Sequence, residues 1–217
     1  MVKVAPSILA ANPLEMGKAV AAAEAGGADW LHIDIMDGHF VPNLSYGPDL
    51  VRNIKKVCSL PLDVHLMLDD PARYAETFLE AGADILTVHQ EVLSAAAFAA
   101  LAERVHAAGR KIGIAVNPPT EGSAVLPYLG FADMALVMTV NPGFGGQSFI
   151  PETIGKMQLI HTAAPQLELE VDGGICAETI AQTAHAGITV AVAGSSVFGA
   201  ASIPQAIQTL REQAVIH

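Results

Sequence analysis

The stretch Leu31-His32-Ile33-Asp34-Ile35-Met36-Asp37-Gly38 alternates aliphatic side chains with polar or sulfur-containing ones and ends at a glycine. Successive residues of a β-strand point to opposite faces, so His32, Asp34 and Met36 share one face and the aliphatic residues share the other. The aliphatic face is suited to packing against helices, and the other face to lining an enclosed space. The stretch therefore predicts a buried strand that carries reactive side chains into the centre of an α/β protein.

The pattern around this strand recurs along the chain, because short runs rich in Val, Ile and Leu alternate with longer, mostly Ala-rich segments of helical character. The predicted strands centre on Val4–Leu9, Trp30–Met36, Leu62–Met67, Ile85–His89, Ile112–Val116, Met134–Met138, Leu167–Val171 and Thr189–Ala193. The predicted helices lie around Leu14–Ala25, Asp49–Val57, Ala72–Ala81, Ala95–Ala107, Gly122–Leu129, Pro151–Thr162, Ala177–Ala186 and Ile203–Ala214. Several helices end at a glycine that can cap the C-terminus, with a strand following directly.

Eight strand–helix units with short connections and no linker predict one (β/α)8 TIM barrel, a single domain over residues 1–217. An open doubly wound sheet is the main alternative, but it does not ordinarily need eight such repeats. In a barrel the carboxyl ends of all strands meet at one mouth, where active sites are built.

Composition narrows the class of protein further. The net charge is −11 and only 11 of 217 residues are Lys or Arg, which argues against nucleic-acid binding because phosphate backbones require clustered cations. Residues 179–210 carry no charged side chain, yet glycines, prolines and polar residues interrupt them, so we expect no membrane span. Two cysteines form no disulfide framework and the first residues do not resemble a secretory leader, which predicts a cytoplasmic protein.

Four residues at three predicted strand ends form a candidate metal site, namely His32, Asp34, His65 and Asp172. Taken singly, a buried histidine is more often a hydrogen-bonded core residue, and an aspartate before Gly-Gly is usually part of a turn. Two imidazoles and two carboxylates buried at one place are costly unless a cation compensates them. The set predicts one divalent ion, for which Zn²⁺, Fe²⁺, Mn²⁺ and Co²⁺ are all suitable.

Glycine-rich segments follow the last three predicted strands and suggest an anion site. They are Asn141-Pro142-Gly143-Phe144-Gly145-Gly146-Gln147, Gly173-Gly174 and Gly194-Ser195-Ser196, and none contains Lys or Arg. One such loop alone would indicate only a tight turn. Three neighbouring loops at a barrel mouth favour a phosphate held by backbone N–H groups, because glycines permit close backbone approach.

The predicted mouth also lacks one kind of residue. No lysine occurs in the predicted strand-to-helix loops, so Schiff-base chemistry has no obvious nucleophile there. Met36, Met67 and Met138 stand near strand ends and either wall the site or pack in the ordinary core.

Taken together in this order, several motifs resemble the ribulose-phosphate 3-epimerase family, from Ala5 to about Phe198. The motifs are Ala5-Pro6-Ser7-Ile8-Leu9, His32 to Gly38 with Phe40-Val41-Pro42-Asn43, Asp63-Val64-His65-Leu66-Met67, Met138 to Gln147, Glu170-Val171-Asp172-Gly173-Gly174 and Val192-Ala193-Gly194-Ser195. The resemblance implies metal ligands at His32, Asp34, His65 and Asp172 and an acid/base pair at Asp34 and Asp172. It implies substrate contacts at Ser7, His65, Gly143, Phe144, Gly145, Gly146, Asp172, Gly173, Gly174, Gly194 and Ser195.

The implied activity is epimerisation at carbon 3 between D-ribulose 5-phosphate and D-xylulose 5-phosphate, in pentose phosphate metabolism. One carboxyl removes the proton from one face of the sugar and the other returns a proton to the opposite face, through a metal-stabilised enediolate. We expect one of the two carboxyls to be protonated and the other ionised before turnover. The resemblance also makes a homo-oligomer plausible.

Other functions remain open at this stage. A six-carbon ketose phosphate such as allulose 6-phosphate is an alternative substrate for the same chemistry. The sugar-phosphate decarboxylases and synthases built on similar barrels expect an Asp-x-Lys-x-x-Asp strand, and here the second strand reads Asp34-Ile35-Met36-Asp37. A sugar-phosphate-binding sensor is the non-enzyme alternative, although it would not need both carboxylates.

Four further predictions concern residues beside these motifs. We expect His89 to be a rim residue hydrogen-bonded to Gln90 or Glu91, Asp37 to cap a loop, and Glu170 to be a buried carboxylate below Asp172. The remaining histidines, at positions 39, 106, 161, 185 and 217, are expected in solvent.

Overall fold

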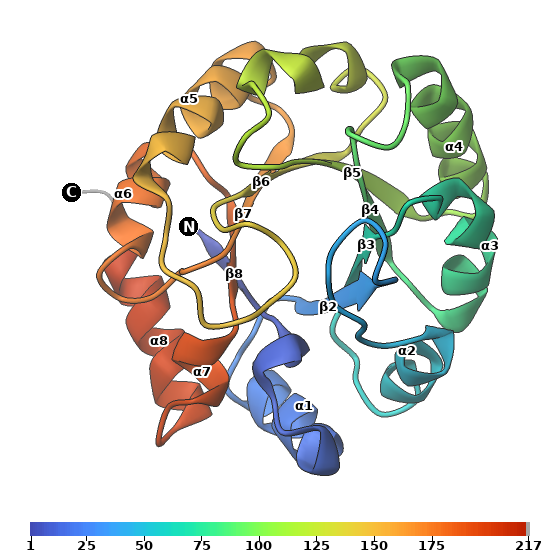
Figure 1. Cartoon of the computed structure of the whole chain (residues 1–217). Helices are drawn as coiled ribbons and strands as arrows, with labels where there is room; N and C mark the ends of the chain where they lie inside the picture. Colours follow the sequence, from blue (N-terminus) through green and yellow to red (C-terminus); the bar gives the residue numbers. More distant parts are fainter. Residues whose placement is uncertain (216–217) are drawn as a thin grey trace.

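Every predicted apolar run forms a strand in the computed structural model, which describes residues 1–215. The strands are β1 (Lys3–Pro6), β2 (Leu31–Met36), β3 (Leu62–Met67), β4 (Ile85–His89), β5 (Lys111–Val116), β6 (Met134–Met138), β7 (Glu168–Asp172) and β8 (Val190–Ala193). They run parallel in the order β1-β8-β7-β6-β5-β4-β3-β2 and form a nearly closed barrel inside a ring of helices (Figure 1). The predicted (β/α)8 barrel is confirmed.

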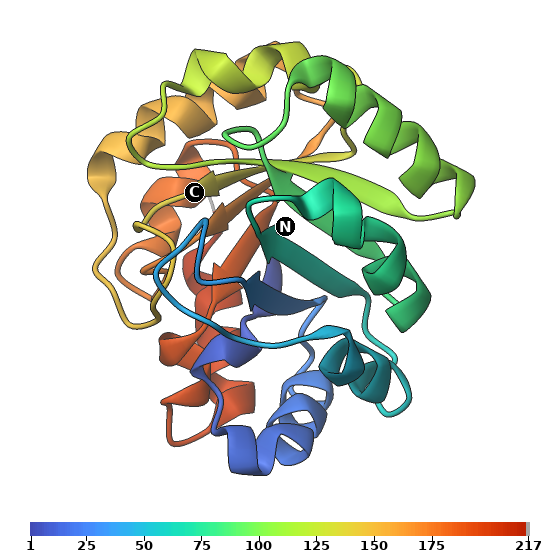
Figure 2. The same ribbon diagram turned by 45° about the vertical axis from the view of Figure 1, so that its right-hand side comes forward.

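The helices are α1 (Met16–Ala25), α2 (Pro48–Lys55), α3 (Pro71–Ala81), α4 (Ala95–Ala107), α5 (Ile154–Ala163), α6 (Ile180–His185), α7 (Ser195–Phe198) and α8 (Ile203–Gln213). Short 3-10 turns are η1 (Ile8–Ala10), η2 (Pro13–Glu15), η3 (Gly122–Tyr128) and η4 (Pro151–Thr153). Figure 2 shows the helices around the barrel from a second direction. Among residues 1–215, no helix combines the length and the apolar character that crossing a bilayer requires.

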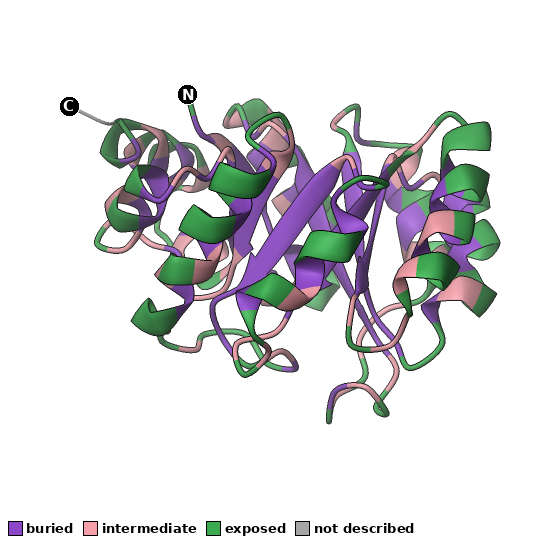
Figure 3. Cartoon of the chain, turned by 90° about the horizontal axis from the view of Figure 1, so that it is seen from above, coloured by how far each residue is buried: buried purple, intermediate pink, exposed green. Residues whose placement is uncertain are grey.

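The aliphatic residues of the strands pack against the helices and form the main core. In Figure 3 the strands at the centre are buried and the helices turn exposed faces outward. Leu31, Ile33 and Leu66 are fully buried on the helix-facing side of their strands, as the alternation in β2 predicts. Burial of these aliphatic side chains is the main favourable contribution to folding.

Two predicted elements differ from the observed ones. The segment predicted as a helix at Gly122–Leu129 is a 3-10 helix, and Pro127 lies inside it. Proline has no N–H to donate and its ring obstructs the preceding turn, so a regular α-helix is disfavoured there. The run predicted as a strand at Val4–Leu9 leaves the sheet after Pro6, because η1 begins at Ile8.

A fourfold repeat organises the amino-terminal end of the barrel. The residue two or one positions before each even-numbered strand exchanges two hydrogen bonds with the preceding odd-numbered strand. Its backbone N–H donates to a strand carbonyl at 2.8–2.9 Å, and its side chain accepts from the N–H of the same strand residue at 2.8–2.9 Å. The pairs are Asp29 with Val4, Asp84 with Leu62, Asp133 with Ile112, and Thr189 with Leu169.

The barrel is least complete between β1 and β2. Within residues 1–215, the only β-bridge between these segments pairs Ser7 with His32, whereas β2 and β3 pair along six positions. The Asp29–Val4 exchange is therefore added here to a single bridge, and not to a strand ladder as at the other three junctions. Arg211 of α8 also donates to Asp29 Oδ2 at 2.7 Å, which connects the last helix to the same point.

Candidate active site

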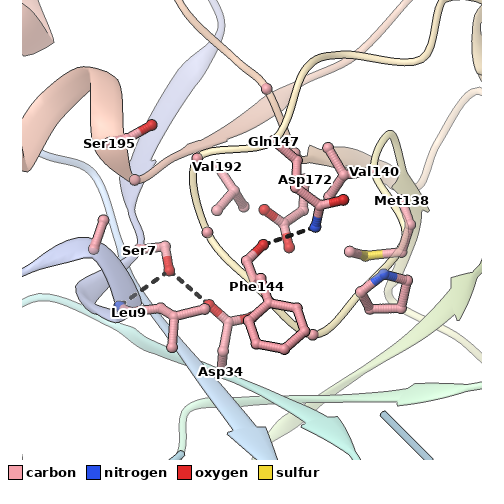
Figure 4. A pocket seen from close by; sticks show the side chains of 18 of the residues that line it. Ser7, Leu9, Asp34, Met138, Val140, Phe144, Gln147, Asp172, Val192 and Ser195 are labelled. Atoms are coloured by element: carbon pink, nitrogen blue, oxygen red, sulfur yellow. Dashed lines mark hydrogen bonds between the residues drawn. The ribbon is translucent and has the colours of Figure 1, made fainter. Parts of the chain in front are cut away.

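A pocket lies at the mouth of the barrel, where the carboxyl ends of the strands meet. Residues from the segment after β1, from the ends of β2, β3, β6, β7 and β8 and from loops that follow these strands line it (Figure 4). The lining includes Ser7, Asp34, Met36, Met67, Met138, Gly143, Phe144, Gly145, Gly146, Asp172, Gly173, Gly174, Gly194 and Ser195. Apart from His32 and His65, every residue predicted for the site is thus part of one pocket.

The two histidines lie directly beneath this lining and complete the predicted cluster. Asp34 Oδ1 is 3.3 Å from His32 Nε2 and 3.3 Å from His65 Nδ1. Asp172 Oδ2 is 3.8 Å from the first nitrogen and 3.9 Å from the second. Register explains the convergence of two strands, because Asp34 of β2 pairs with His65 of β3.

The cluster fits a divalent metal ion. His32 Nε2 and His65 Nδ1 are fully buried and have no hydrogen-bond partner among the described residues, although such nitrogens are normally satisfied. Ligands about 2.0–2.1 Å from a tetrahedral Zn²⁺ lie roughly 3.3–3.4 Å from one another, close to the distances observed here. The four donor atoms all lie within 4.8 Å of one another.

Both histidines are held from behind by residues that the sequence analysis did not include in the site. His32 Nδ1 is 2.6 Å from Asp63 Oδ2, and Thr87 donates to the other Asp63 oxygen at 3.2 Å. His65 Nε2 is 2.8 Å from His89 Nε2. All of these side chains are fully buried.

The two carboxyl groups of the pocket differ in pKa because their surroundings differ. Burial by itself would raise the pKa of Asp34, but the adjacent His32 and His65 outweigh burial and lower it. Burial and the charge of Asp34 raise the pKa of Asp172 to about 7. The pKa of Asp172 therefore lies above that of Asp34, and the protonation states expected before turnover stay a prediction.

Glu170 is the buried carboxyl below Asp172, as predicted from strand parity. It is fully buried, and neither of its oxygens has a hydrogen-bond partner among the described residues. Burial and the charge of Asp63 raise the pKa of Glu170 well above its ordinary value. Its Oε1 lies 3.9 Å from His32 Nδ1, so it belongs to the surroundings of the cluster rather than to the pocket.

The glycine-rich loops differ in what their glycines accomplish. Gly173 and Gly174 have φ angles of +121° and +64°, and a Cβ on Gly174 would lie 2.4 Å from the backbone nitrogen of Phe149. These two glycines are therefore required by the loop itself. A Cβ on Gly145 would meet nothing within 4 Å, so contacts with the protein do not require glycine there.

Ser7 and the methionines complete the pocket. Ser7 Oγ donates to Asp34 Oδ2 at 2.6 Å, and Figure 4 shows Ser7 between Leu9 and Asp34, with Asp172 directed into the same hollow. Met36 and Met67 form a small apolar cluster with Val41, and Met138 belongs to another one. All three methionines line the pocket as well, so each of them both walls the site and packs in an apolar cluster.

Three predictions about neighbouring residues can be compared with their surroundings. Asp37 caps a loop as predicted, because its Oδ1 accepts from the N–H groups of His39 and Phe40 and its Oδ2 from that of Asp69. The rim position predicted for His89 is wrong, since the side chain is fully buried beneath Phe40, although its bond to Glu91 is present. His39, His106, His161 and His185 are exposed as predicted, and His217 lies outside the described residues.

Strand parity contained a signal for one of the missed residues. Asp63 shares the inward face of β3 with His65, so the same count that selected His65 also selects Asp63. His89 ends β4 and would have needed the register between β3 and β4, in which His65 pairs with Thr87.

Comparison with known proteins assigns the family. Residues 3–198 match the model of the ribulose-phosphate 3 epimerase family. The chain is 43% identical over 216 residues to ribulose-phosphate 3-epimerase of Bacillus subtilis, which covers 97% of this chain and 99% of that protein. It is 46% identical over 215 residues to ribulose-phosphate 3-epimerase of Mycobacterium bovis, which covers 97% and 92% respectively.

A solved structure of lower sequence identity shares the fold. The 3-keto-L-gulonate-6-phosphate decarboxylase of Vibrio cholerae superposes with a TM-score of 0.76 at 18% identity, over 98% of this chain and 97% of that one. At this identity the likeness concerns the barrel and not the reaction. The family match spans most of the barrel and the relatives cover nearly the whole chain, so this protein belongs to the ribulose-phosphate 3-epimerase family.

Proposed function

We propose that this protein interconverts D-ribulose 5-phosphate and D-xylulose 5-phosphate by inverting carbon 3. The observation that carries the proposal is the convergence of Asp34 and Asp172 on one pocket, beside two buried histidine nitrogens without a protein partner. Family membership supports the same reaction, because the relatives named above are ribulose-phosphate 3-epimerases.

His32, Asp34, His65 and Asp172 would hold one divalent ion, which is Zn²⁺, Fe²⁺, Mn²⁺ or Co²⁺ by the chemistry of the donor set. When bound, the ion supplies Lewis acidity that stabilises the negative charge developing on the sugar oxygens as the C3 proton leaves. The buried cluster supports this role, since four ionisable side chains within 4.8 Å of one another are costly without a compensating charge.

Asp34 and Asp172 act as the acid/base pair. They extend from β2 and from the end of β7, and their different positions supply two carboxyls for the two faces of a planar enediolate. In either direction one carboxylate accepts the C3 proton while the other carboxyl donates one. The hydrogen bond from Ser7 restrains the orientation of Asp34 and leaves its Oδ1 toward the cluster.

The phosphate lies against the loops that follow β6, β7 and β8. Gly143 to Gly146, Gly173, Gly174, Gly194 and Ser195 line this side of the pocket, and no Lys or Arg is among the lining residues. The anion is therefore held by backbone N–H groups and the Ser195 hydroxyl rather than by a charged side chain. The open space around Gly145 supports a close approach of the ligand to the backbone.

The methionines shield the reacting atoms. Met36, Met67 and Met138 surround the carboxylates with apolar, non-titrating side chains, which limits proton exchange with bulk water. A direct contact of His65 with the sugar stays a prediction, since His65 lies beneath the lining. The cytoplasmic location and the homo-oligomeric assembly expected from the sequence also stay predictions.

Incubation of ribulose 5-phosphate with the protein in D₂O tests the reaction. We expect xylulose 5-phosphate carrying deuterium at C3 and little elsewhere, with loss of labelling after chelation and recovery when a divalent ion is restored. Allulose 6-phosphate serves as the comparison substrate, and the larger kcat/KM identifies the preferred chain length. Unconverted and unlabelled sugar across all four metals would refute the proposal.

A further inference from the structure

The two histidines of the cluster are supported from behind in different ways. His32 Nδ1 faces Asp63, and a carboxylate oxygen only accepts hydrogen bonds, so the proton of His32 lies on Nδ1 and the lone pair on Nε2. His65 Nε2 faces His89 Nε2 at 2.8 Å. An imidazole nitrogen either donates or accepts, so this contact alone does not fix which nitrogen of His65 carries the proton.

Glu91 determines the direction of the hydrogen bonds that connect it to His89 and His89 to His65. Its Oε1 accepts from the backbone N–H of Asn117 at 2.8 Å and from the hydroxyl of Thr120 at 2.7 Å. Its Oε2 lies 3.2 Å from His89 Nδ1. A carboxylate that accepts on both oxygens requires a proton on His89 Nδ1.

The remaining proton positions follow from that one. His89 Nε2 is then a lone pair and accepts the N–H of His65 Nε2, so the lone pair of His65 is on Nδ1. This is the nitrogen that lies 3.3 Å from Asp34 Oδ1 and has no hydrogen-bond partner among the described residues. The order Glu91–His89–His65 therefore directs a free lone pair into the cluster.

The surroundings protect the two histidines of this order from competing water, while Glu91 keeps 20% of its side-chain surface exposed. His65 and His89 are fully buried and lie edge to edge across this hydrogen bond, with ring centroids 4.9 Å apart and planes inclined by 22°. The Phe40 ring packs against His89, with centroids 4.6 Å apart and planes inclined by 49°. In such an environment, the hydrogen bonds within the protein determine the tautomer.

We propose that Glu91 and His89 are positioning residues that keep the proton of His65 on Nε2, so that Nδ1 is free to bind a metal ion. The inference rests on the metal site of the proposed function and extends it to two residues outside the pocket. Outer hydrogen-bond partners of this kind typically change metal affinity by about 10–100-fold when they are removed.

Glu91→Gln tests the proton order with little change of shape. The Asn117 N–H can only donate, so the amide oxygen stays toward it and the amide NH₂ turns toward His89. His89 would then donate to His65, and the proton of His65 would move to Nδ1, inside the cluster. Thr120→Val is the matched control, because it removes a donor from Oε1 of the same carboxylate and leaves the bond to His89.

Two measurements follow, on full-length protein. Competition with a chromogenic chelator gives the Zn²⁺ dissociation constant, for which we expect an increase of about 10–100-fold in Glu91→Gln and less than about threefold in Thr120→Val. Nitrogen-15 NMR of the metal-free protein should show His65 protonated on Nε2 in the wild type and on Nδ1 in Glu91→Gln. His89→Phe, which removes the acceptor of the His65 N–H, should weaken Zn²⁺ binding to a similar extent and replaces Glu91→Gln if that variant does not fold.

Distinct results overturn the inference. Unchanged Zn²⁺ affinity in Glu91→Gln, equal weakening in Thr120→Val, or a wild-type spectrum with the His65 proton on Nδ1 would each refute it. A wild-type protein that binds none of Zn²⁺, Fe²⁺, Mn²⁺ and Co²⁺ would refute both the inference and the metal site of the proposed function. Normal wild-type binding with unaffected variants would refute the inference alone.

Discussion

Asp34 and Asp172 illustrate how position distinguishes two residues of the same type. Asp34 lies between two imidazoles and accepts from Ser7, whereas Asp172 keeps 15% of its side-chain surface exposed at the end of β7. The pKa of the first is lowered and that of the second is raised to about 7. An acid/base pair needs such a difference, because one member has to donate while the other accepts.

Asp172→Asn tests this assignment, since an amide cannot exchange the C3 proton. We expect kcat to fall by at least about 100-fold, while the affinity for inorganic phosphate, measured by calorimetry, changes little because the anion is bound by other residues. Glu168→Gln is the control, since Glu168 lies at the opposite end of β7 and bonds to Lys3 and Thr189. Normal turnover in Asp172→Asn would remove this residue from the mechanism.

Gly174→Ala should destabilise the protein through its backbone. The position has φ of +64°, and the added Cβ would lie 2.4 Å from the nitrogen of Phe149. We expect the free energy of unfolding in urea to fall by about 2 kcal/mol or more. Gly130→Ala, where a Cβ meets nothing within 4 Å, should change it by less than about 0.5 kcal/mol. Equal effects in the two variants would contradict this account.

For single residues, the alternation of inward and outward positions along the strands predicted more of the site than the amino-acid composition did. Counting inward positions along β2 and β3 was enough to identify His32, Asp34 and His65 as neighbours. The network behind them was not identified, because the contact between His65 and His89 depends on the distance between two strands and on burial under Phe40. The number of residues between His65 and His89 in the sequence predicts neither the distance between their strands nor this burial.

At the scale of elements, the loop after β2 depends on a single carboxylate. Asp37 accepts from two N–H groups of its own loop at 2.8 and 2.9 Å and from Asp69, which follows β3, at 2.8 Å. Burial opposes its ionisation, but these three donors lower the pKa of Asp37 below its ordinary value. The side chain therefore joins two loops of the barrel mouth most strongly while it is ionised.

Asp37→Asn should consequently lower the free energy of unfolding by an amount that depends on pH. A lowered pKa in the folded state means that the charge stabilises the protein above the ordinary aspartate pKa and that this stabilisation is lost as the pH falls through the folded-state value. We expect the variant to be about 1–2 kcal/mol less stable than the wild type at pH 7, with a smaller difference at pH 3. Urea unfolding at both pH values measures this, and a difference that grows on acidification would contradict it.

The elements also show where helix prediction fails. Eight Ala-rich or amphipathic stretches were expected to be helices, and the one after β5 became a 3-10 helix containing Pro127. Lys156 of α5 restrains the loop that precedes this 3-10 helix. Its Nζ donates to the carbonyls of Asn117 and Pro118 at 2.7 and 2.6 Å and to that of Thr120. Contacts with a distant helix thus define a segment whose own sequence is a weak helix former.

At the scale of the whole molecule, the fourfold repeat and the candidate site lie at opposite ends of the barrel. The exchanged hydrogen bonds of Asp29, Asp84, Asp133 and Thr189 all lie at the amino-terminal end of the barrel. The candidate site occupies the opposite end, where the strand-following loops are free to vary. The sequence predicted the barrel from its alternation of strands and helices, but not this repeat, because the partners are 20 to 25 residues apart.

The seam between β1 and β2 makes one member of the repeat more important than the others. Four pairs connect β5 to β6, whereas the described part of β1 and β2 has one bridge, from Ser7 to His32, besides the Asp29–Val4 exchange. Asp29→Ala leaves the Val4 N–H without its acceptor and also removes one of the two acceptors of Arg211, which keeps the Gly27 carbonyl. A buried donor without a partner costs about 1–3 kcal/mol.

We therefore expect Asp29→Ala to lower the free energy of unfolding by more than Asp133→Ala, although each variant removes one side-chain acceptor from a strand N–H. Hydrogen exchange followed by mass spectrometry should show lost protection in residues 3–6 and 31–36 in the first variant. In the second, the loss should stay near residue 112, because the ladder on both sides of β5 continues to hold the strand. Equal destabilisation, or exchange that spreads evenly around the barrel in both, would mean that the seam is no weaker than the rest of the sheet.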